Sequence, residues 1–269
     1  MVRLDASEVE EYKEFNPESS SIYFTCILKG KADGIIWANR KKSPDFFLVW
    51  SPYQEGFQLI GQPLAKNEWE EFGDWFESTI IPFLIKQGMD YFEYGADTKE
   101  LADMFQSIFA KKEIFTSEQK IFHWSLAKTD LSQPKGYEIK KVDPTFLENN
   151  YQNNEYILDE LKRAYGDVKK YFGHGIAYVA IQENRIVARA DMLFSDQGYG
   201  NISVDTDEAH RRKGLAAYLA MKTIEDTRKL GLCPIWDCTD DNFASENTAK
   251  KCGFQMIRKE SISWFIIGG

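Results

Sequence analysis

Residues 204–216 read Val204-Asp-Thr-Asp-Glu-Ala-His-Arg-Arg-Lys-Gly-Leu-Ala216, and this stretch decides how the second half of the chain is interpreted. It predicts the end of a strand, a basic turn, and a helix that opens at Gly214. The first N–H groups of a helix have no internal partner and the helix dipole favours anions there, so such a turn can hold a pyrophosphate. Positive charges at a helix N-terminus are repelled by the helix dipole, so the three cations Arg211, Arg212 and Lys213 should destabilise the folded protein unless a bound anion neutralises them. This cost favours an anion-binding role for the loop.

The segments around this stretch predict a mixed sheet flanked by helices, which is an α/β (mixed α+β) fold. Alternating apolar residues bounded by turn residues predict strands, and apolar residues at helical spacing predict helices. A strand that feeds a helix and returns as a neighbouring strand implies one parallel crossover beside an antiparallel meander. The predicted strands are 175–181, 186–194, 201–206, 234–238 and 261–267. The predicted helices are 214–229 and 245–251, and residues 155–171 are predicted as a helix or helical turns.

The length and composition predict two domains. The chain has 269 residues, of which 43% are hydrophobic and 14% aromatic, enough for one large or two ordinary cores. A polar segment, Asp130–Gly136, contains Pro134 and Gly136 and lies between two strand-like stretches. The sequence therefore predicts domains at residues 1–133 and 134–269.

The charge balance limits the kinds of molecule that the protein is expected to bind. Lys and Arg number 33 against 42 Asp and Glu, and this formal charge of −9 argues against nucleic acid or an anionic membrane. No run approaches the roughly 18 apolar residues of a membrane span, and the first residues lack a signal peptide's apolar core, so we expect a cytoplasmic protein. The four cysteines predict free thiols, and Cys233 and Cys238 lack the spacing of a metal site, so no metal is expected.

Two short motifs resemble those of one enzyme family. Arg211-x-x-Gly214-x-Ala216 resembles the R/Q-x-x-G-x-G/A signature of the GNAT superfamily of N-acetyltransferases, in which this loop holds the pyrophosphate of coenzyme A (CoA). Asn242-x-x-Ser245, followed by Lys251-Cys-Gly-Phe254, resembles the N-x-x-A…K-x-G-F segment that borders the pantetheine arm. The resemblance covers about residues 136 to 269.

The resemblance implies acetyl-CoA as co-substrate and a set of binding residues. Backbone groups of Val204 and Thr206 would pair with the pantetheine amides as an added strand. Asn242 would hydrogen-bond near the thioester, with Ser245 at the start of the following helix, although ordinary turn and N-cap roles explain both residues equally well without the family. The pyrophosphate would be bound by Arg211, Arg212, Lys213, Gly214, Leu215 and Ala216.

The two halves of the sequence show a weak internal repeat. Residues 86–97 align with residues 229–240, each a helix end, a glycine and a strand. The same offset places Glu68-Trp-Glu-Glu71 where the basic loop would be, and carboxylates there repel phosphate. We therefore expect a degenerate GNAT-like N-terminal domain that binds no CoA, in a chain that resembles the two-domain GNATs related to zwittermicin resistance acetyltransferases. Aromatic residues in this half fit core packing, or alternatively an acceptor pocket: Trp37, Phe46, Phe47, Trp50, Tyr53 and Phe57.

The catalytic groups are less clear in the sequence. Many GNATs use a Glu on the strand before the CoA loop and a Tyr in the helix of the second motif, but the corresponding positions here are Gly200-Asn201 and Ala249. We predict Asp205 as the proton acceptor, the alternative being a solvated carboxylate beside Arg211. Other candidates are Asp191, Asp237, His174 and Cys238.

The predicted function is transfer of an acetyl or short acyl group from CoA to an amine. The acidic composition favours a small cationic acceptor such as an amino sugar, a polyamine or an amine-bearing antibiotic, with a protein amine as an alternative. A non-catalytic acyl-CoA-binding regulatory protein is the alternative from another class, because the usual Glu and Tyr are missing.

Overall fold

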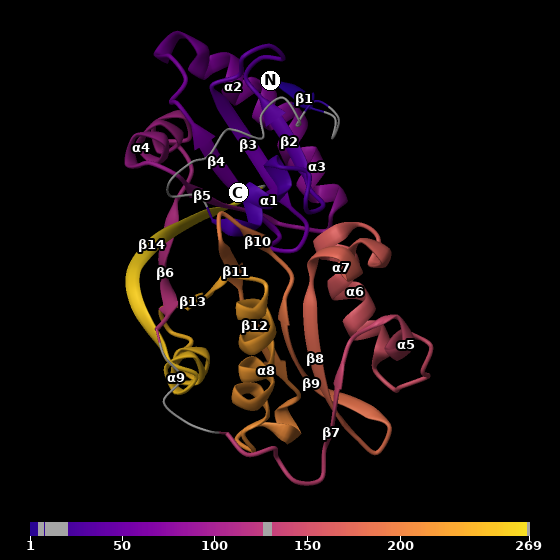
Figure 1. Cartoon of the computed structure of the whole chain (residues 1–269). Helices are drawn as coiled ribbons and strands as arrows, with labels where there is room; N and C mark the ends of the chain where they lie inside the picture. Colours follow the sequence, from indigo (N-terminus) through magenta and orange to yellow (C-terminus); the bar gives the residue numbers. More distant parts are fainter. Residues whose placement is uncertain (5–7, 9–20, 126–130, 268–269) are drawn as a thin grey trace. The chain divides into compact units, whose positions relative to one another are not determined.

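The chain forms two compact units. The computed structural model describes residues 1–4, 8, 21–125 and 131–267 (Figure 1). The first unit consists of Met1–Glu118 together with Ser261–Gly269, and the second of Gln119–Glu260. These units differ in extent from the domains 1–133 and 134–269, which stay a prediction, and residues 126–130 of the expected boundary region lie outside the described residues.

The first unit is a sheet with helices. Its strands follow the order β1-β2-β3-β4-β5-β14, in which β4 and β5 are parallel and the other pairs within β1–β5 are antiparallel. Residues 263–266 of β14 (Phe254–Ile266) pair with β5. The strands are β1 (Val2–Leu4), β2 (Ile35–Ala38), β3 (Phe46–Ser51), β4 (Gly56–Gly61) and β5 (Tyr91–Ala96). The helices are α1 (Ile22–Leu28), η2 (Lys66–Glu68), α2 (Trp69–Trp75), η3 (Phe76–Ile80), α3 (Ile81–Lys86) and α4 (Lys99–Ile108).

Aromatic side chains fill the core of the first unit. Trp37, Phe46, Phe47, Trp50 and Phe57 are buried. Phe265, from the end of β14, is fully buried in the same cluster. Core packing is therefore confirmed for Trp37, Phe46, Phe47, Trp50 and Phe57, whereas Tyr53 is half-buried and stacks on Tyr23.

The second unit holds two sheets. One has the order β12-β9-β8-β7, and β6, β13, β11 and β10 are neighbours in the other. The strands are β6 (Phe115–Trp124), β7 (Glu138–Lys141), β8 (Ile176–Gln182), β9 (Arg185–Met192), β10 (Ser195–Asp196), β11 (Tyr199–Asn201), β12 (Ser203–Thr206) and β13 (Cys233–Thr239). The helices are α5 (Pro144–Leu147), α6 (Asn154–Tyr165), α7 (Val168–His174), η4 (Glu208–His210), α8 (Leu215–Lys229) and α9 (Phe243–Lys251).

Two predicted elements are divided in the structure. The predicted strand 201–206 is two strands, β11 and β12, which part at Ile202 and belong to different sheets. The predicted helix 155–171 is also two helices, because Gly166 takes a left-handed φ of 70° and ends α6, after which Asp167 caps α7. Among the described residues, every helix is too short or too polar to cross a bilayer.

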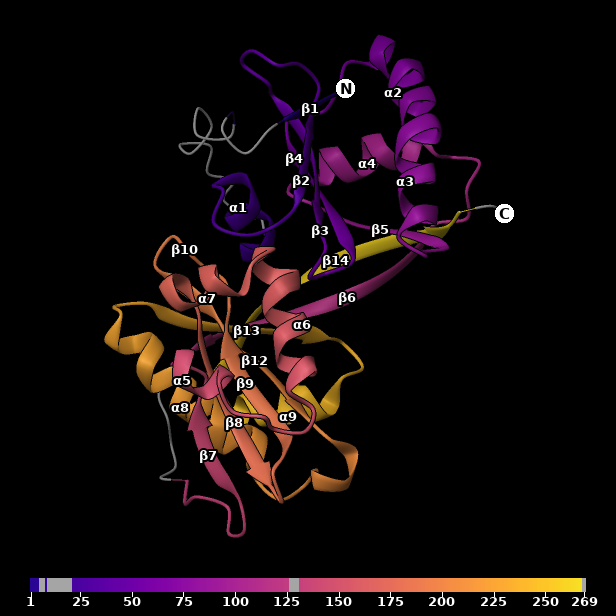
Figure 2. The ribbon, with the colours of Figure 1, turned by 90° about the vertical axis from the view of Figure 1, so that its right-hand side faces the viewer.

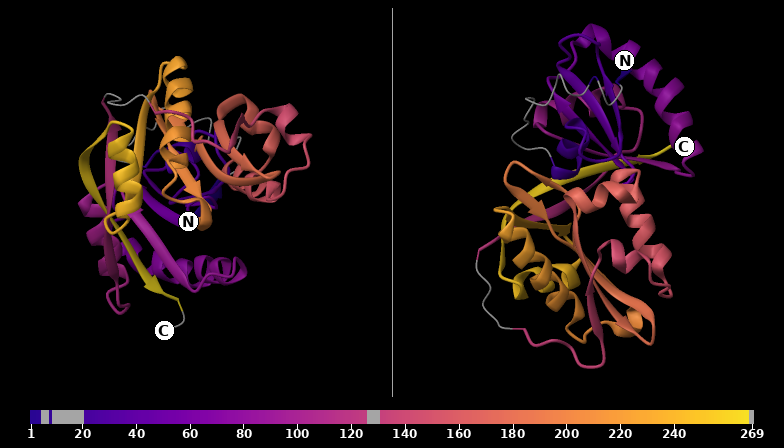
Figure 3. Two further views of the ribbon diagram at one scale, coloured as in Figure 1. Left: turned by 90° about the horizontal axis from the view of Figure 1, so that it is seen from below. Right: turned by 45° about the vertical axis from the view of Figure 1, so that its right-hand side comes forward.

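The four-stranded sheet has different neighbours on its two faces. Along β9, Ala188 and Ala190 pack in one cluster with Leu215 and Leu219 of α8. Since side chains alternate along a strand, Arg189 and Asp191 face the other way. Tyr156 of α6 contacts Arg189 there, so α8 and α6 cover opposite faces (Figures 2 and 3).

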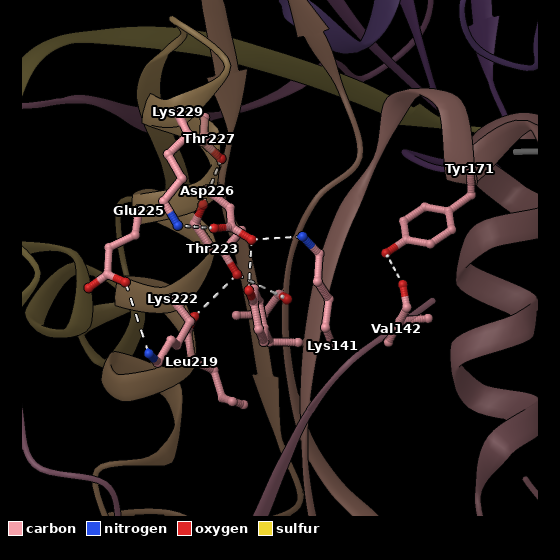
Figure 4. Close-up of polar contacts among 12 residues, drawn as sticks. Lys141, Val142, Tyr171, Leu219, Lys222, Thr223, Glu225, Asp226, Thr227 and Lys229 are labelled. Atoms are coloured by element: carbon pink, nitrogen blue, oxygen red, sulfur yellow. Dashed lines mark hydrogen bonds and ion pairs between the residues drawn. The ribbon is translucent and has the colours of Figure 1, made fainter. Parts of the chain in front are cut away.

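A half-buried carboxylate, that of Asp226, links α8 to its sheet. Asp226 accepts hydrogen bonds from Lys141 of β7, Tyr178 of β8 and Lys229 of α8, each at 2.7 Å (Figure 4). Burial alone would raise the pKa of Asp226, but these hydrogen bonds outweigh it and hold the pKa well below its usual value. The network fixes the helix that follows the basic loop.

The repeat seen in the sequence is present as local structure. Helix α3 ends at Lys86, Gly88 takes a φ of 80°, and β5 follows. Helix α8 ends at Lys229, Gly231 takes a φ of 77°, and β13 follows. In both places a left-handed glycine terminates the helix, where a side chain would be strained.

Candidate active site

Strands β11 and β13 run side by side and then β12 departs. Residues 199–201 pair in parallel with residues 233–235, and the bond from Ile202 N to Ile235 O at 2.8 Å is the last between them. The next residue, Ser203, pairs with Asp191 of β9 instead. Beyond Ile235, β13 pairs with β6 on its other side. The two strands therefore diverge, and each presents one edge that no described strand covers.

The open edge of β12 has a defined pattern of backbone groups. Asp207 N donates to Val187 O at 2.9 Å, which fixes the alternation, so Ser203 and Asp205 direct their backbone groups to β9. Val204 and Thr206 direct theirs to the open edge, and their pairing with the pantetheine amides stays a prediction. The edge groups of Thr206 have partners within the chain: its N–H donates to Asp205 Oδ1 at 2.7 Å and its carbonyl accepts from Arg211 Nε at 3.1 Å.

The basic loop leads from this edge into α8. The first helical bond runs from Tyr218 N to Gly214 O at 3.0 Å, so the N–H groups of residues 215–217 lie ahead of the hydrogen-bonded ladder. Gly214 has a φ of 83°, and an added Cβ would meet no atom within 4 Å. There is thus open space beside these N–H groups, and the residues fit a pyrophosphate.

The predicted pyrophosphate residues lie together at this helix start. Arg211, Arg212, Lys213 and Gly214 are exposed, whereas Leu215 is buried against the sheet. None of the three cations forms an ion pair with another described residue, so their charge is available to an anion. Arg212 has a left-handed φ of 62°, and Gly214 is left-handed as well, so the backbone changes direction twice within the loop.

The second motif forms the start of α9. Asn242 is its N-cap, and its Oδ1 accepts from Ser245 N at 3.0 Å. Ser245 Oγ accepts from the buried indole of Trp236 at 2.9 Å. The N-cap role, one of the two readings of Asn242 from sequence, is thus present, and its exposed side-chain Nδ2 has no partner among the described residues. Contact of either residue with the pantetheine arm stays a prediction.

Asp205 belongs to a polar network on the α6 face. Its Oδ2 accepts a hydrogen bond from Tyr156, whose hydroxyl in turn accepts from Arg189 Nε at 3.0 Å. Arg189 also pairs with Asp191 and, at 3.2 Å, with Glu160. Burial raises the pKa of the Tyr156 hydroxyl. Asp205 is an exposed carboxylate with two hydrogen-bond partners, the Tyr156 hydroxyl and Thr206 N, and its role as the proton acceptor stays a prediction.

Asp191 is the most deeply buried of the candidate carboxylates. Burial raises its pKa to about 6, although the Arg189 guanidinium acts in the opposite direction. One carboxylate oxygen, Oδ1, has no hydrogen-bond partner within the described part of the chain. The side chain lies in the interior under α6 rather than at the open edge.

Asp237 lies where the strands part. Its Oδ1 accepts from Asn201 Nδ2 at 2.5 Å, and its Oδ2 accepts from Gln119 of β6. Ile235 is the last residue of β13 that pairs with β11. Asp237 follows two residues later, so its side chain lies on the same face of the sheet as that of Ile235. The buried Trp236 and Cys238 alternate with it and face the α8 side. Asp237 and Asn201 therefore share the face opposite α8.

The other candidates are placed less favourably. His174 is exposed at the end of α7 and stacks on Tyr165. Cys238 is buried, and burial raises the pKa of its thiol. The four cysteines are free thiols, as expected. Within the described ranges, no three His, Cys, Asp or Glu side chains are grouped as metal ligands would be.

The first unit differs at the matching positions. Its β4 and β5 stay paired in parallel from Phe57–Tyr94 to Leu59–Ala96, and a further bond joins Asp97 N to Leu59 O at 3.0 Å. The strands therefore do not open. At the following helix, Glu68 Oε2 accepts from Ala65 N at 2.8 Å, so carboxylates stand where the second unit has cations.

Comparison with known proteins identifies the family. The sequence model described as "GNAT acetyltransferase" matches residues 13–262, so the chain belongs to the GNAT acetyltransferase family. As a member of it, the chain is an N-acetyltransferase that uses acetyl-CoA as co-substrate. It is 24% identical over 252 residues to a Bacillus subtilis (strain 168) protein named uncharacterized N-acetyltransferase YdfB, a match that spans 92% of each chain.

Solved structures share the fold. A GCN5-related N-acetyltransferase-like protein from Streptococcus suis 89/1591 matches with a TM-score of 0.63 and 21% identity, over 97% of this chain and 99% of that one. A tandem GNAT protein from the clavulanic acid biosynthesis pathway matches with a TM-score of 0.63 and 11% identity, over 100% of this chain and 98% of that one. The predicted mixed sheet flanked by helices is confirmed.

Sequence reasoning missed three members of the site. Tyr156, Arg189 and Gln119 come from elements far from the loop in sequence, and no local pattern marks them. The available signal was the alternation on β9, which places Arg189 and Asp191 on one face of a strand whose other residues, apart from Arg185, are apolar.

Proposed function

We propose that the second unit binds one acetyl-CoA and transfers its acetyl group to the amine of a small cationic molecule. The observation that carries the proposal is the combination of an open β12 edge with an unpaired basic loop at the N-terminus of α8. Residues 211–216 would bind the pyrophosphate, and Val204 with Thr206 would pair with the pantetheine amides. Pairing at Thr206 then replaces its internal bonds to Asp205 and Arg211, whereas Val204 faces the edge directly.

The acceptor side of the proposal rests on charge. Arg189 pairs with Asp191 and Glu160, and Asp205 joins the same network through Tyr156, so three carboxylates stand against one guanidinium within this network. A cationic amine is attracted to such a face. Asp205 as the proton acceptor is the hypothesis that the sequence alone supports.

The proposal includes a single CoA per chain. In the first unit β4 and β5 remain paired, and Glu68 occupies the position of the first loop cation. We propose that this unit is a degenerate GNAT-like domain, and that the chain is a two-domain GNAT similar to zwittermicin resistance acetyltransferases that acts in the cytoplasm without a metal.

The test combines binding with turnover. Purified protein is titrated with acetyl-CoA in a calorimeter and then incubated with acetyl-CoA and a panel of amino sugars, polyamines, amine-bearing antibiotics and peptides, while free thiol is followed. Binding with turnover of a small cationic amine supports the proposal. Turnover of peptides alone would make it a protein acetyltransferase, and tight binding without turnover of any amine would favour an acyl-CoA-binding regulator.

A further inference from the structure

We propose that Asp237, held by Asn201 and Gln119, is the proton acceptor of acetyl transfer, in place of Asp205. This inference rests on the proposed CoA site in the second unit. It follows from the direction in which a CoA molecule must lie on β12 and from what the structure places at the far end.

The direction is set by the two ends of β12. The pyrophosphate loop follows the C-terminal residue of β12, Thr206, so the pantetheine arm must run from Thr206 toward Val204. Its two amides pair with these two residues, and the thioester lies beyond the second amide. The thioester therefore lies on the N-terminal side of Val204, near Ile202 and Asn201, where β11 and β13 part.

Asp205 is on the wrong part of this path. It lies between the two residues that pair with the amides, and its carboxylate is bonded to Tyr156 and to Thr206 N. An amine that attacks the thioester would approach at the vertex of the opening instead. Asp205 and its network then contact the remainder of the acceptor.

Asp237 lies at the point where β11 and β13 part. The 2.5 Å bond from Asn201 Nδ2 to its Oδ1 spans the point at which the strands separate, and Gln119 holds its Oδ2. These two amide donors fix the orientation of the carboxylate at the point where the strands part. Many GNATs carry a Glu on this strand, and here Asn201 of the strand donates a hydrogen bond to the carboxylate of Asp237 instead.

The chemistry balances with these groups. The ammonium of the acceptor gives one proton to the Asp237 carboxylate, and the neutral nitrogen attacks the thioester carbonyl carbon to form the C–N bond. The C–S bond then breaks, and the thiolate takes the second proton that the nitrogen loses. Asp237 returns its proton to solvent, so the products are the amide, CoA thiol and one released proton.

An acceptor-independent probe tests the position of the carboxylate. CoA alkylated on sulfur with a 2-aminoethyl group places an ammonium beside the sulfur, and S-ethyl-CoA is its neutral match. We expect the wild-type protein to bind the aminoethyl compound about tenfold more tightly, because the ammonium donates to Asp237. Asp237→Asn should abolish this preference with S-ethyl-CoA affinity unchanged, and Asp205→Asn should keep it.

Each result is decisive. If S-ethyl-CoA does not bind the wild-type protein, the proposed CoA site fails. If it binds but the preference is absent, survives Asp237→Asn, or is lost in Asp205→Asn, the assignment of Asp237 is overturned. Unchanged S-ethyl-CoA binding shows that a variant is folded, and Asp237→Ser serves as a second variant should the Asn form not fold.

Discussion

The basic loop makes its clearest prediction through Gly214. In Gly214→Glu, a carboxylate is placed in the open space where the pyrophosphate would lie. Two like charges about 4 Å apart repel by about 4 kcal/mol at an effective dielectric constant near 20, so a hundredfold loss of affinity, about 2.7 kcal/mol, is within reach of this one substitution.

The expected shift in melting temperature follows from the affinity. Acetyl-CoA at about a hundred times its Kd should stabilise the wild type by about 2.7 kcal/mol, which raises its Tm by roughly 5–10 °C. At the same concentration a hundredfold weaker variant gains only about 0.4 kcal/mol. Thermal melting with and without acetyl-CoA measures the difference.

The matched control is at the other end of the same helix. Gly231 has a φ of 77°, close to the 83° of Gly214, and an added Cβ at either position meets no atom within 4 Å. Gly231→Glu therefore carries the same charge and a similar backbone strain of about 1–2 kcal/mol, but away from the loop. It should keep the full acetyl-CoA shift. An equal shift in the two variants would refute the assignment of the loop.

Three further predictions concern other parts of the chain. Calorimetry should give one acetyl-CoA per chain, and two equivalent sites would contradict the degenerate first unit. Asp205→Asn should raise the acceptor KM and leave kcat within about threefold, whereas a fall in kcat of about a hundredfold would restore Asp205 as the proton acceptor. Because the pKa of Asp226 is lowered in the folded state, its stabilisation is present above the unfolded-state value of about 4 and is lost as pH falls further. Asp226→Asn should thus lower the free energy of unfolding at pH 7 by about 1–3 kcal/mol and lose less stability than wild type in urea denaturation at pH 3, and equal losses would count against the network.

Local patterns predicted the elements that local forces determine. The start of α8 follows from Gly214 and the apolar spacing behind it, and the buried aromatic residues of the first unit follow from their chemistry. The repeat of helix, glycine and strand was visible because a helix end leaves a direct signal in the sequence.

The non-local features could not be predicted in the same way. The break at Ile202 arises because β11 pairs with β13 while β12 pairs with β9, and nothing within residues 199–206 distinguishes two sheets from one strand. The hydrogen bond between Asn201 and Asp237 joins residues 36 positions apart. Such pairings depend on the fold that brings them together.

The first unit is built from both ends of the chain, which affects the order in which the two units can fold during synthesis. Its residues 1–118 leave the ribosome long before residues 261–267, which supply Phe265 to its core. The whole second unit is synthesised in between. The first unit must therefore wait, with one strand missing, while the later unit emerges and can fold, which reverses the usual N-terminal-first order. A released chain that ends after Glu260 would hold all the residues of the second unit attached to a first unit that lacks its last strand.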